Sequence, residues 1–299
     1  MSKVALVKPT LWRDYWELTK PRVVALMLLT AWVGMLLASP AEIFPLNAMI
    51  FGTLGIACCA GSAAVINQLV ERHIDIHMRR TQNRPLAQGR VGPIQGMLFA
   101  LSLGTFGLGV LIYFVNYVTA WLTLISLVGY ALFYTIFLKR ATPQNIVIGG
   151  AAGAAPPLLG WTAVTGQIDP FGLLLVLIIF TWTPPHFWAL AIYRHEDYAK
   201  AKLPMLPVTH GILFTKLCIL LYTVLLIACT VLPFLTGMCG ITYLISALGL
   251  GAGFLYYGIK LYFSDDPRVA MSTFTYSIIY LMALFIGLLV DHYLHFLLN

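Results

Sequence analysis

The chain has 299 residues, of which 60% are hydrophobic and only 10% are charged. Soluble domains carry about 25% charged residues, so this composition, with a mean hydropathy of +0.86, excludes a soluble globular enzyme and indicates an integral membrane protein. The formal net charge of +7 is compatible with a nucleic-acid partner, but the placement of the cations along the chain argues against one.

The first 22 residues are polar, and Trp12, Tyr15 and Trp16 are interleaved with charged side chains. This pattern is typical of an amphipathic segment lying at a membrane surface. We expect Thr19 to cap the following helix and Pro21 to occupy its first turn.

Nine later segments have the length and apolarity of membrane spans, which need about 20 mostly apolar residues. They are residues 23–40, 46–67, 94–114, 118–138, 145–165, 171–192, 214–235, 240–260 and 271–290. The sequence therefore predicts one all-α polytopic membrane domain over residues 1–299 with nine transmembrane helices.

The cations fix the expected orientation of these spans. With the N-terminus in the cytoplasm, all 18 lysines and arginines fall in cytoplasmic segments, and the opposite connections have none. This distribution obeys the positive-inside rule and places the C-terminus on the opposite side. It also explains the basic charge without nucleic acid, so we expect no nucleic-acid partner.

The connection at residues 68–92 carries the strongest chemical signal. Asn67, Glu71 and Asp75 are four residues apart and share one face if the preceding helix continues through them. Carboxylate and amide oxygens are ligands that Mg²⁺ prefers, and it commonly shares them with phosphate. Four arginines surround these acids: Arg72, Arg79, Arg80 and Arg84. Metal ligands and anion-binding cations in one segment predict a metal-bridged diphosphate site.

The connection at residues 193–212 repeats this mixture, because Glu196 and Asp197 are followed by Lys200 and Lys202. We expect both connections to be catalytic loops whose acidic motifs face one cavity and hold one or two Mg²⁺ ions. In the alternative interpretation, Glu196 and Asp197 only make a loop soluble.

Two helix interiors carry further signals. Small residues follow Asn145 through residue 160, and they allow close approach of either another helix or a flat ligand. Pro184 and Pro185 precede His186 inside a span. An ionisable residue there indicates a functional site by default, and the competing interpretation is a hydrogen-bonded core histidine. The five cysteines lie in apolar runs without metal-site spacing and are expected to be core residues.

The motif of Asn67, Glu71 and Asp75, with Arg80 and Arg84 behind it, resembles the UbiA superfamily of polytopic prenyltransferases. Four further motifs are similar to the branch that farnesylates protohaem IX: Thr19-Lys20-Pro21-Arg22, Gly153-Ala-Ala-Pro156-Pro157, Pro185-His186-Phe187 and Tyr193-Arg194-x-Glu196-Asp197-Tyr198. The motifs run from residue 19 to about residue 211. Glu71 departs from the aspartate typical of the quinone branch, and Ala201 stands where the second motif often has an aspartate.

The resemblance implies a UbiA-like fold with nine helices around a central cavity. The implied reaction transfers the farnesyl group of farnesyl diphosphate to a vinyl group of haem b, with addition of water, and gives haem O and diphosphate for respiratory oxidases. Haem b is then a substrate, and Mg²⁺ is the cofactor. The implied metal ligands are Asn67, Glu71, Asp75 and Asp197. The other implied site residues are Arg80, Arg84, Glu196 and Lys202 for catalysis and His186 (as a haem contact), Arg194, Lys139 and Asn145 for substrate binding.

The resemblance also implies a bacterial cytoplasmic (inner) membrane location, contact with membrane lipid, and a downstream haem A synthase or oxidase assembly factor as partner. Three alternatives remain at this stage. A prenyltransferase of the same fold acting on an aromatic quinone precursor is distinguished by a substrate assay. A transporter of anionic lipids or metabolites is distinguished by Mg²⁺-dependent diphosphate release. A structural haem chaperone leaves the diphosphate-type loop unexplained.

Overall fold

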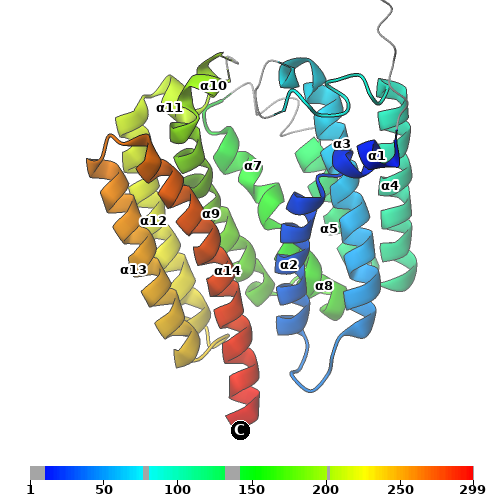
Figure 1. Cartoon of the computed structure of the whole chain (residues 1–299). Coiled ribbons are helices and arrows are strands. Elements are labelled where there is room, and N and C mark those ends of the chain that lie inside the picture. Colours follow the sequence, from blue (N-terminus) through cyan, green and yellow to red (C-terminus); the bar gives the residue numbers. More distant parts are fainter. Residues whose placement is uncertain (1–10, 77–80, 132–141, 201–202, 299) are drawn as a thin grey trace, which may run out of the picture.

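The computed structural model describes residues 11–76, 81–131, 142–200 and 203–298, which form helices and their connections and contain no strand (Figure 1). In chain order the helices are α1 (Trp12–Leu18), α2 (Pro21–Ala38), the π-helical η1 (Ala48–Gly52), α3 (Thr53–Asp75), α4 (Pro93–Phe114), α5 (Tyr117–Val128), α7 (Asn145–Ala154), α8 (Pro156–Thr165), α9 (Pro170–Tyr193), α10 (His195–Lys200), α11 (Leu206–Thr209), α12 (Ile212–Leu235), α13 (Ile241–Phe263) and α14 (Pro267–Leu298).

Eight helical segments of the described chain are long and apolar enough to cross a membrane. Six of the predicted spans coincide with single helices to within a few residues, and the predicted span 145–165 is built from α7 and α8 together. The predicted span 46–67 corresponds to the segment Ala48–Asp75, which continues past the predicted end. The ninth predicted span, 118–138, is represented by the shorter apolar helix Tyr117–Ala131. Residues 132–138 of that span lie outside the described residues, so the chain is a multi-pass helical membrane protein with eight full-length spans described.

Two local expectations need correction. Residues 68–75, predicted to begin a loop, continue helix α3 to Asp75. Thr19 does not cap α2: the N-cap is Lys20, and the Thr19 hydroxyl donates instead to the carbonyl of Trp16 at 2.8 Å. Pro21 does occupy the first position of α2, where its missing N–H needs no partner.

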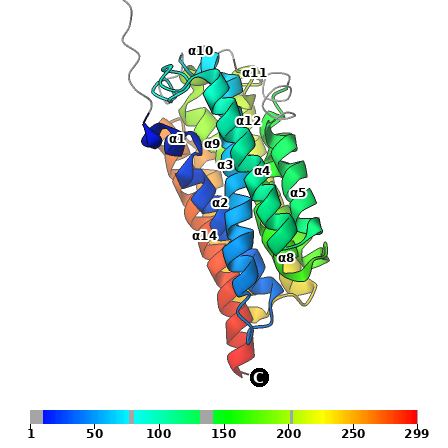
Figure 2. The same cartoon turned by 90° about the vertical axis from the view of Figure 1, so that its right-hand side faces the viewer.

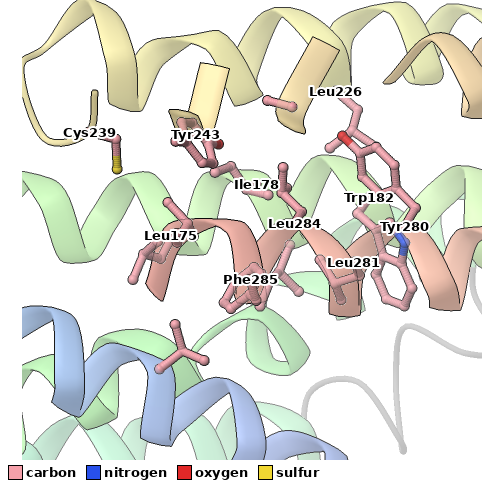
Figure 3. Packing of buried hydrophobic residues seen from close by; sticks show 14 of the residues in the cluster. Leu175, Ile178, Trp182, Leu226, Cys239, Tyr243, Tyr280, Leu281, Leu284 and Phe285 are labelled. Atoms are coloured by element: carbon pink, nitrogen blue, oxygen red, sulfur yellow. The ribbon is translucent and has the colours of Figure 1, made fainter. Parts of the chain in front are cut away.

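The helices pack in two groups that α8 and α9 join in sequence. In the first, α3 packs on α4 and α2 packs on α8, and in the second, α9, α12, α13 and α14 pack around one apolar core. Figure 3 shows this core, in which Leu175 and Trp182 of α9 lie close to Tyr243 of α13 and Phe285 of α14. The predicted span pattern succeeds because these helices need only an apolar face toward each other and toward lipid.

Helices α2 and α8 approach each other at two glycines. A Cβ at Gly34 would lie 2.1 Å from the carbonyl oxygen of Pro157, and a Cβ at Gly160 would lie 1.9 Å from that of Ala31. The small residues predicted to admit a helix or a flat ligand therefore serve helix packing at Gly160. Gly153 on α7 has nothing within 4 Å of its Cβ position.

The two ends of the bundle differ in charge. The end that carries α1, the last turn of α3, α10 and the start of α14 holds the lysines and arginines of the described residues (Figure 1); we call it the cation-rich end. At the other end, buried Asp291 of α14 accepts hydrogen bonds from the backbone N–H groups of Gly240 (2.6 Å) and Tyr243 (3.0 Å). A carboxylate there satisfies donors at the start of α13 and favours its helix dipole.

Two surface grooves are formed by described residues. One, of about 390 Å³, is lined by residues of α13 and α14 with Tyr193 of α9, and the other, of about 220 Å³, lies between α4 and α5. Neither lies between the two helix groups, so the central cavity implied by the resemblance stays a prediction.

Candidate active site

The last turns of α3 carry a column of buried oxygen ligands. Asn67, Glu71 and Asp75 are only 3%, 5% and 3% exposed. Because α3 runs unbroken to Asp75, residues four apart lie one turn above each other on the same face. Two carboxylates and an amide are thus enclosed at the cation-rich end; we call these three residues the oxygen column.

Arg84 contacts the two residues of this column that lie nearest the C-terminal end of α3, Glu71 and Asp75. Its Nη1 is 2.9 Å and 2.8 Å from the two carboxylate oxygens of Asp75 and 3.7 Å from Oε2 of Glu71. The loop that carries Arg84 is tied to α3, because the Thr81 hydroxyl donates to the carbonyl of Asp75 at 3.1 Å. A buried carboxylate without a nearby cation is strongly destabilising, so Arg84 compensates acids that would otherwise carry uncompensated charge.

Lys20 contacts Asn67, the first residue of the column. Lys20 was not among the predicted site residues. Its Nζ donates to Oδ1 of Asn67 at 2.5 Å. Lys20 has φ 52°, the one positive φ outside glycine among the described residues, and this left-handed conformation costs about 1–2 kcal/mol for a residue with a Cβ. Its membership in the Thr19-Lys20-Pro21-Arg22 motif was the available signal, but the motif alone does not say what the side chain contacts.

Helix α1 holds Lys20 in place. It lies across the bundle beside the end of α3 (Figure 1, Figure 2), and the Gln68 side chain donates to the carbonyl of Leu18 at 2.8 Å. Arg90 binds buried Asp14 and lies 3.4 Å from Glu17. These contacts join α1 both to α3 and to the loop that carries Arg84.

The second acidic motif has a different environment. Glu196 is on α10 with its side chain 86% exposed and 3.8 Å from Nζ of Lys200, and Asp197 lies 3.8 Å from Arg194. Within the described ranges, no group of three His, Cys, Asp or Glu side chains is placed to hold a metal. The described contacts therefore do not bring Asp197 to the oxygen column, and its metal role stays a prediction.

The remaining predicted residues divide by location. Arg80, Lys139 and Lys202 lie outside the described residues. Asn145 is fully buried at the first position of α7, and Arg194 ends α9. Both lie at the cation-rich end, as the sequence predicted for residues that bind substrate.

His186 occupies an aromatic slot between α9 and α14. Its ring stacks on Trp182 (centroids 4.2 Å apart) and on Phe274 (4.5 Å), and Nδ1 lies 2.6 Å from the Ser277 hydroxyl. Since that hydroxyl donates to the carbonyl of Phe274, Nδ1 must carry the ring proton and donate to Ser277. In the neutral ring Nε2 therefore keeps its lone pair, and it makes no hydrogen bond to the described residues. His186 is thus hydrogen-bonded in the core, as in the competing interpretation, and its contact with haem stays a prediction.

The oxygen column suits a hard divalent cation by the chemistry of its donors. Two carboxylates and an amide oxygen on successive turns provide the ligand types of Mg²⁺. Lys20 and Arg84 supply positive charge next to them, as binding of a phosphate-type anion requires.

The model of the UbiA prenyltransferase family matches residues 27–289. The chain belongs to the UbiA prenyltransferase family. The oxygen column, Arg84 and the aromatic slot of His186 all lie within the matched residues, and Lys20 lies just before them.

Two relatives place the chain within this family. It is 65% identical over 283 residues to a protoheme IX farnesyltransferase of Teredinibacter turnerae, covering 95% of this chain and 91% of that protein. It is 64% identical over 282 residues to the protein of the same name of Marinobacter nauticus, covering 94% and 93%.

Solved UbiA structures share the fold. A digeranylgeranylglyceryl phosphate synthase has a TM-score of 0.79 at 20% identity, covering 94% of this chain and 98% of that one. A UbiA homologue from Archaeoglobus fulgidus, solved with GPP and Mg²⁺, has a TM-score of 0.61 at 17% identity, covering 92% and 99%.

Proposed function

We propose that this chain is a protohaem IX farnesyltransferase. It transfers the farnesyl group of farnesyl diphosphate to a vinyl group of haem b, with addition of water, and releases haem O and diphosphate. The observation that carries the proposal is the buried oxygen column of α3 with Lys20 and Arg84 beside it, in a chain 65% identical to a protein of that name.

The diphosphate end of the substrate is assigned to the oxygen column. The C–O bond of farnesyl diphosphate breaks with its electron pair leaving on diphosphate, and Arg84 and Lys20 stabilise this developing negative charge. Asn67, Glu71 and Asp75 are the residues that would hold Mg²⁺. When bound there, the ion supplies Lewis-acid stabilisation of the leaving group, and the A. fulgidus homologue was solved with GPP and Mg²⁺.

The carbon chemistry needs no protein nucleophile. The vinyl π electrons of haem form the new C–C bond to the allylic carbon, and water oxygen then bonds to the cationic carbon beside the pyrrole and loses a proton.

We assign His186 to haem. Its Nε2 lone pair is the donor that haem iron requires, and the Ser277 hydroxyl fixes the tautomer that presents it. The test is the absorption spectrum and affinity of haem bound to His186→Ala, with Ser277→Ala as the variant that disturbs only the tautomer. We expect a shifted Soret band and weaker binding for His186→Ala and a smaller change for Ser277→Ala. If His186→Ala binds haem with the spectrum and affinity of wild type, His186 is not a ligand of the haem iron.

The membrane setting follows from the same proposal. The cation-rich end faces the cytoplasm of a bacterial inner membrane, at the level of the charged diphosphate group, and the apolar product is passed to a haem-modifying or oxidase-assembly partner in the same membrane. Farnesyl and haem are both apolar, so they are expected to enter sideways from lipid.

The deciding experiment incubates purified protein in detergent with haem b, farnesyl diphosphate and Mg²⁺ and analyses haem by chromatography and mass. Asp75→Asn is the matched variant, because it keeps the shape of the side chain and removes the charge that Arg84 faces. We expect a haem with a hydroxyethylfarnesyl mass from wild type only. Unchanged haem with consumption of farnesyl diphosphate on an aromatic acceptor indicates a quinone-type prenyltransferase, and intact farnesyl diphosphate with every acceptor overturns the enzymatic assignment.

A further inference from the structure

Both ends of the oxygen column are held by cations of the protein itself. Lys20 donates to Asn67 at 2.5 Å, and Arg84 lies 2.8 Å from Asp75 and 3.7 Å from Glu71. Each carboxylate and the amide oxygen of the column therefore has a cation of the protein within 4 Å. The oxygens assigned to Mg²⁺ are thus already in contact with positive charge from the protein.

Lys20 is held there by the backbone as well as by its side chain. Its left-handed conformation lies between Pro21, whose ring fixes φ, and α1, which is anchored through Leu18 and Asp14. Lysine also has a long, flexible stem that lets the ammonium exchange one oxygen for another within reach. Arg84, in contrast, binds both oxygens of its carboxylate through one nitrogen.

A divalent cation arriving alone meets an unfavourable site. It has to displace the Lys20 ammonium from Asn67, and it adds two positive charges to a site whose carboxylates are already paired with Arg84, where the low dielectric of a buried site magnifies any excess charge. A diphosphate arriving with the metal reverses this balance, because its oxygens accept hydrogen bonds from the displaced ammonium and its charge offsets the excess.

We propose that Lys20 is a positioning residue that occupies Asn67 in the substrate-free protein and transfers its ammonium to the diphosphate, so that metal and diphosphate bind together and neither binds well alone. This inference rests on the proposed function, since it concerns the same metal–diphosphate site. It predicts positive coupling between the two ligands, which in proteins typically amounts to roughly 5–150-fold in affinity.

The test measures Mn²⁺, as a paramagnetic substitute for Mg²⁺, binding to the full chain in detergent, by the loss of the free-ion electron spin resonance signal. Titrations are done with and without inorganic diphosphate, and each is compared with a protein-free titration, because diphosphate itself binds Mn²⁺ in solution. Lys20→Met removes the charge and keeps most of the stem, and Lys20→Asn suits the left-handed backbone. Lys200→Met is the matched control, because Lys200 is at the same end but its side chain is 75% exposed and pairs with Glu196.

For wild type and Lys200→Met we expect diphosphate to tighten Mn²⁺ binding by about tenfold or more. For both Lys20 variants we expect Mn²⁺ alone to bind about tenfold more tightly than to wild type and the coupling to fall below about threefold. Folded Lys20 variants whose Mn²⁺ affinity and coupling equal those of wild type overturn the role of Lys20 while leaving the proposed function intact. Absence of Mn²⁺ binding to wild type even with diphosphate overturns the metal–diphosphate site itself.

Discussion

Arg84 shows how a single side chain stabilises the site and takes part in its chemistry. One of its nitrogens contacts both oxygens of Asp75 and lies near Glu71, and its side chain is only 17% exposed. Removing one partner of a buried ion pair costs about 3–5 kcal/mol because the remaining charge is left uncompensated. Arg84 is therefore expected to affect folding and catalysis together.

We predict that Arg84→Gln lowers the thermal unfolding midpoint and reduces farnesyl transfer by about 100-fold or more, which corresponds to the roughly 2.7–4 kcal/mol of one lost transition-state donor. Haem product formation and a melting curve in detergent measure the two effects. Arg268→Gln is the control, since Arg268 is 89% exposed and pairs only with nearby Asp266. Equal activity of the two variants contradicts the assignment of Arg84.

For individual residues, the sequence predicted contacts that lie within one helix and missed contacts between segments far apart in the chain. The spacing of Asn67, Glu71 and Asp75 reveals a shared face because helical geometry is local. The Lys20–Asn67 bond joins residues 47 positions apart, and no periodicity in the sequence encodes that distance. The exposure of Glu196 agrees with the alternative interpretation that it makes a loop soluble, but the sequence could not decide between the two interpretations because the choice depends on how α10 packs.

Individual helices are positioned by close backbone contacts and by caps from neighbouring helices. The contact of α2 with α8 depends on Gly34 and Gly160, where a Cβ would overlap backbone carbonyl oxygens. Backbone atoms cannot rotate away as a flexible side chain can, so the helices themselves would have to separate.

We predict that Gly160→Leu destabilises the protein by about 1–3 kcal/mol or more through overpacking. The expected result is a lower melting temperature and less monodisperse protein in size-exclusion chromatography. Gly153→Leu is the matched control on α7, because no atom lies within 4 Å of its Cβ position. If the two variants unfold at the same temperature, the close approach of α2 and α8 is not limiting for stability.

Asp291 links α14 to the start of α13 through two backbone N–H groups. We predict that Asp291→Ala lowers the free energy of unfolding by about 2–3 kcal/mol, since hydrogen bonds to a buried charged group contribute about 1.5–3 kcal/mol. Asp291→Asn keeps one acceptor oxygen and should lower the free energy of unfolding by less than Asp291→Ala does. Thermal unfolding in detergent measures both, with exposed Glu42→Gln at the same end as the charge control; an unchanged melting temperature for Asp291→Ala argues against the cap.

Element positions were predictable where hydropathy alone decides them. The spans matched the helices because a membrane requires continuous apolar segments with satisfied backbone groups. The wrong predictions concern helix ends that polar residues determine. Helix α3 continues beyond its apolar part to Asp75, and Lys20 rather than Thr19 caps α2. There, tertiary contacts override local capping preferences.

Across the whole molecule, the lysines and arginines of the described residues gather at one end of the bundle. The cations of the described residues and the oxygen column share one end, and α14 extends to the C-terminus at the other (Figure 1). Because lysine and arginine are retained on the cytoplasmic side during insertion, the asymmetry predicts that the cation-rich end faces the cytoplasm.

We predict that the N-terminus is cytoplasmic and the C-terminus is on the opposite side. In bacterial cells, a full-length C-terminal fusion to alkaline phosphatase should be active, and a C-terminal green fluorescent protein should stay dark. An N-terminal fluorescent fusion, which should be bright, controls for expression. Fluorescence from the C-terminal fusion would contradict the prediction, because it would mean that the C-terminus is cytoplasmic and that either the orientation or the number of spans is different.

The attachment of α1 has a consequence for the order of assembly. Arg90, which holds Asp14, is 76 residues further along the chain, and at about 5–20 residues per second it is synthesised roughly 4–15 seconds later. The first helix to leave the ribosome therefore cannot dock until α3 and the following loop exist. The residues that complete the site from the N-terminal side therefore settle only after the segments that they contact, although they are the first to be made.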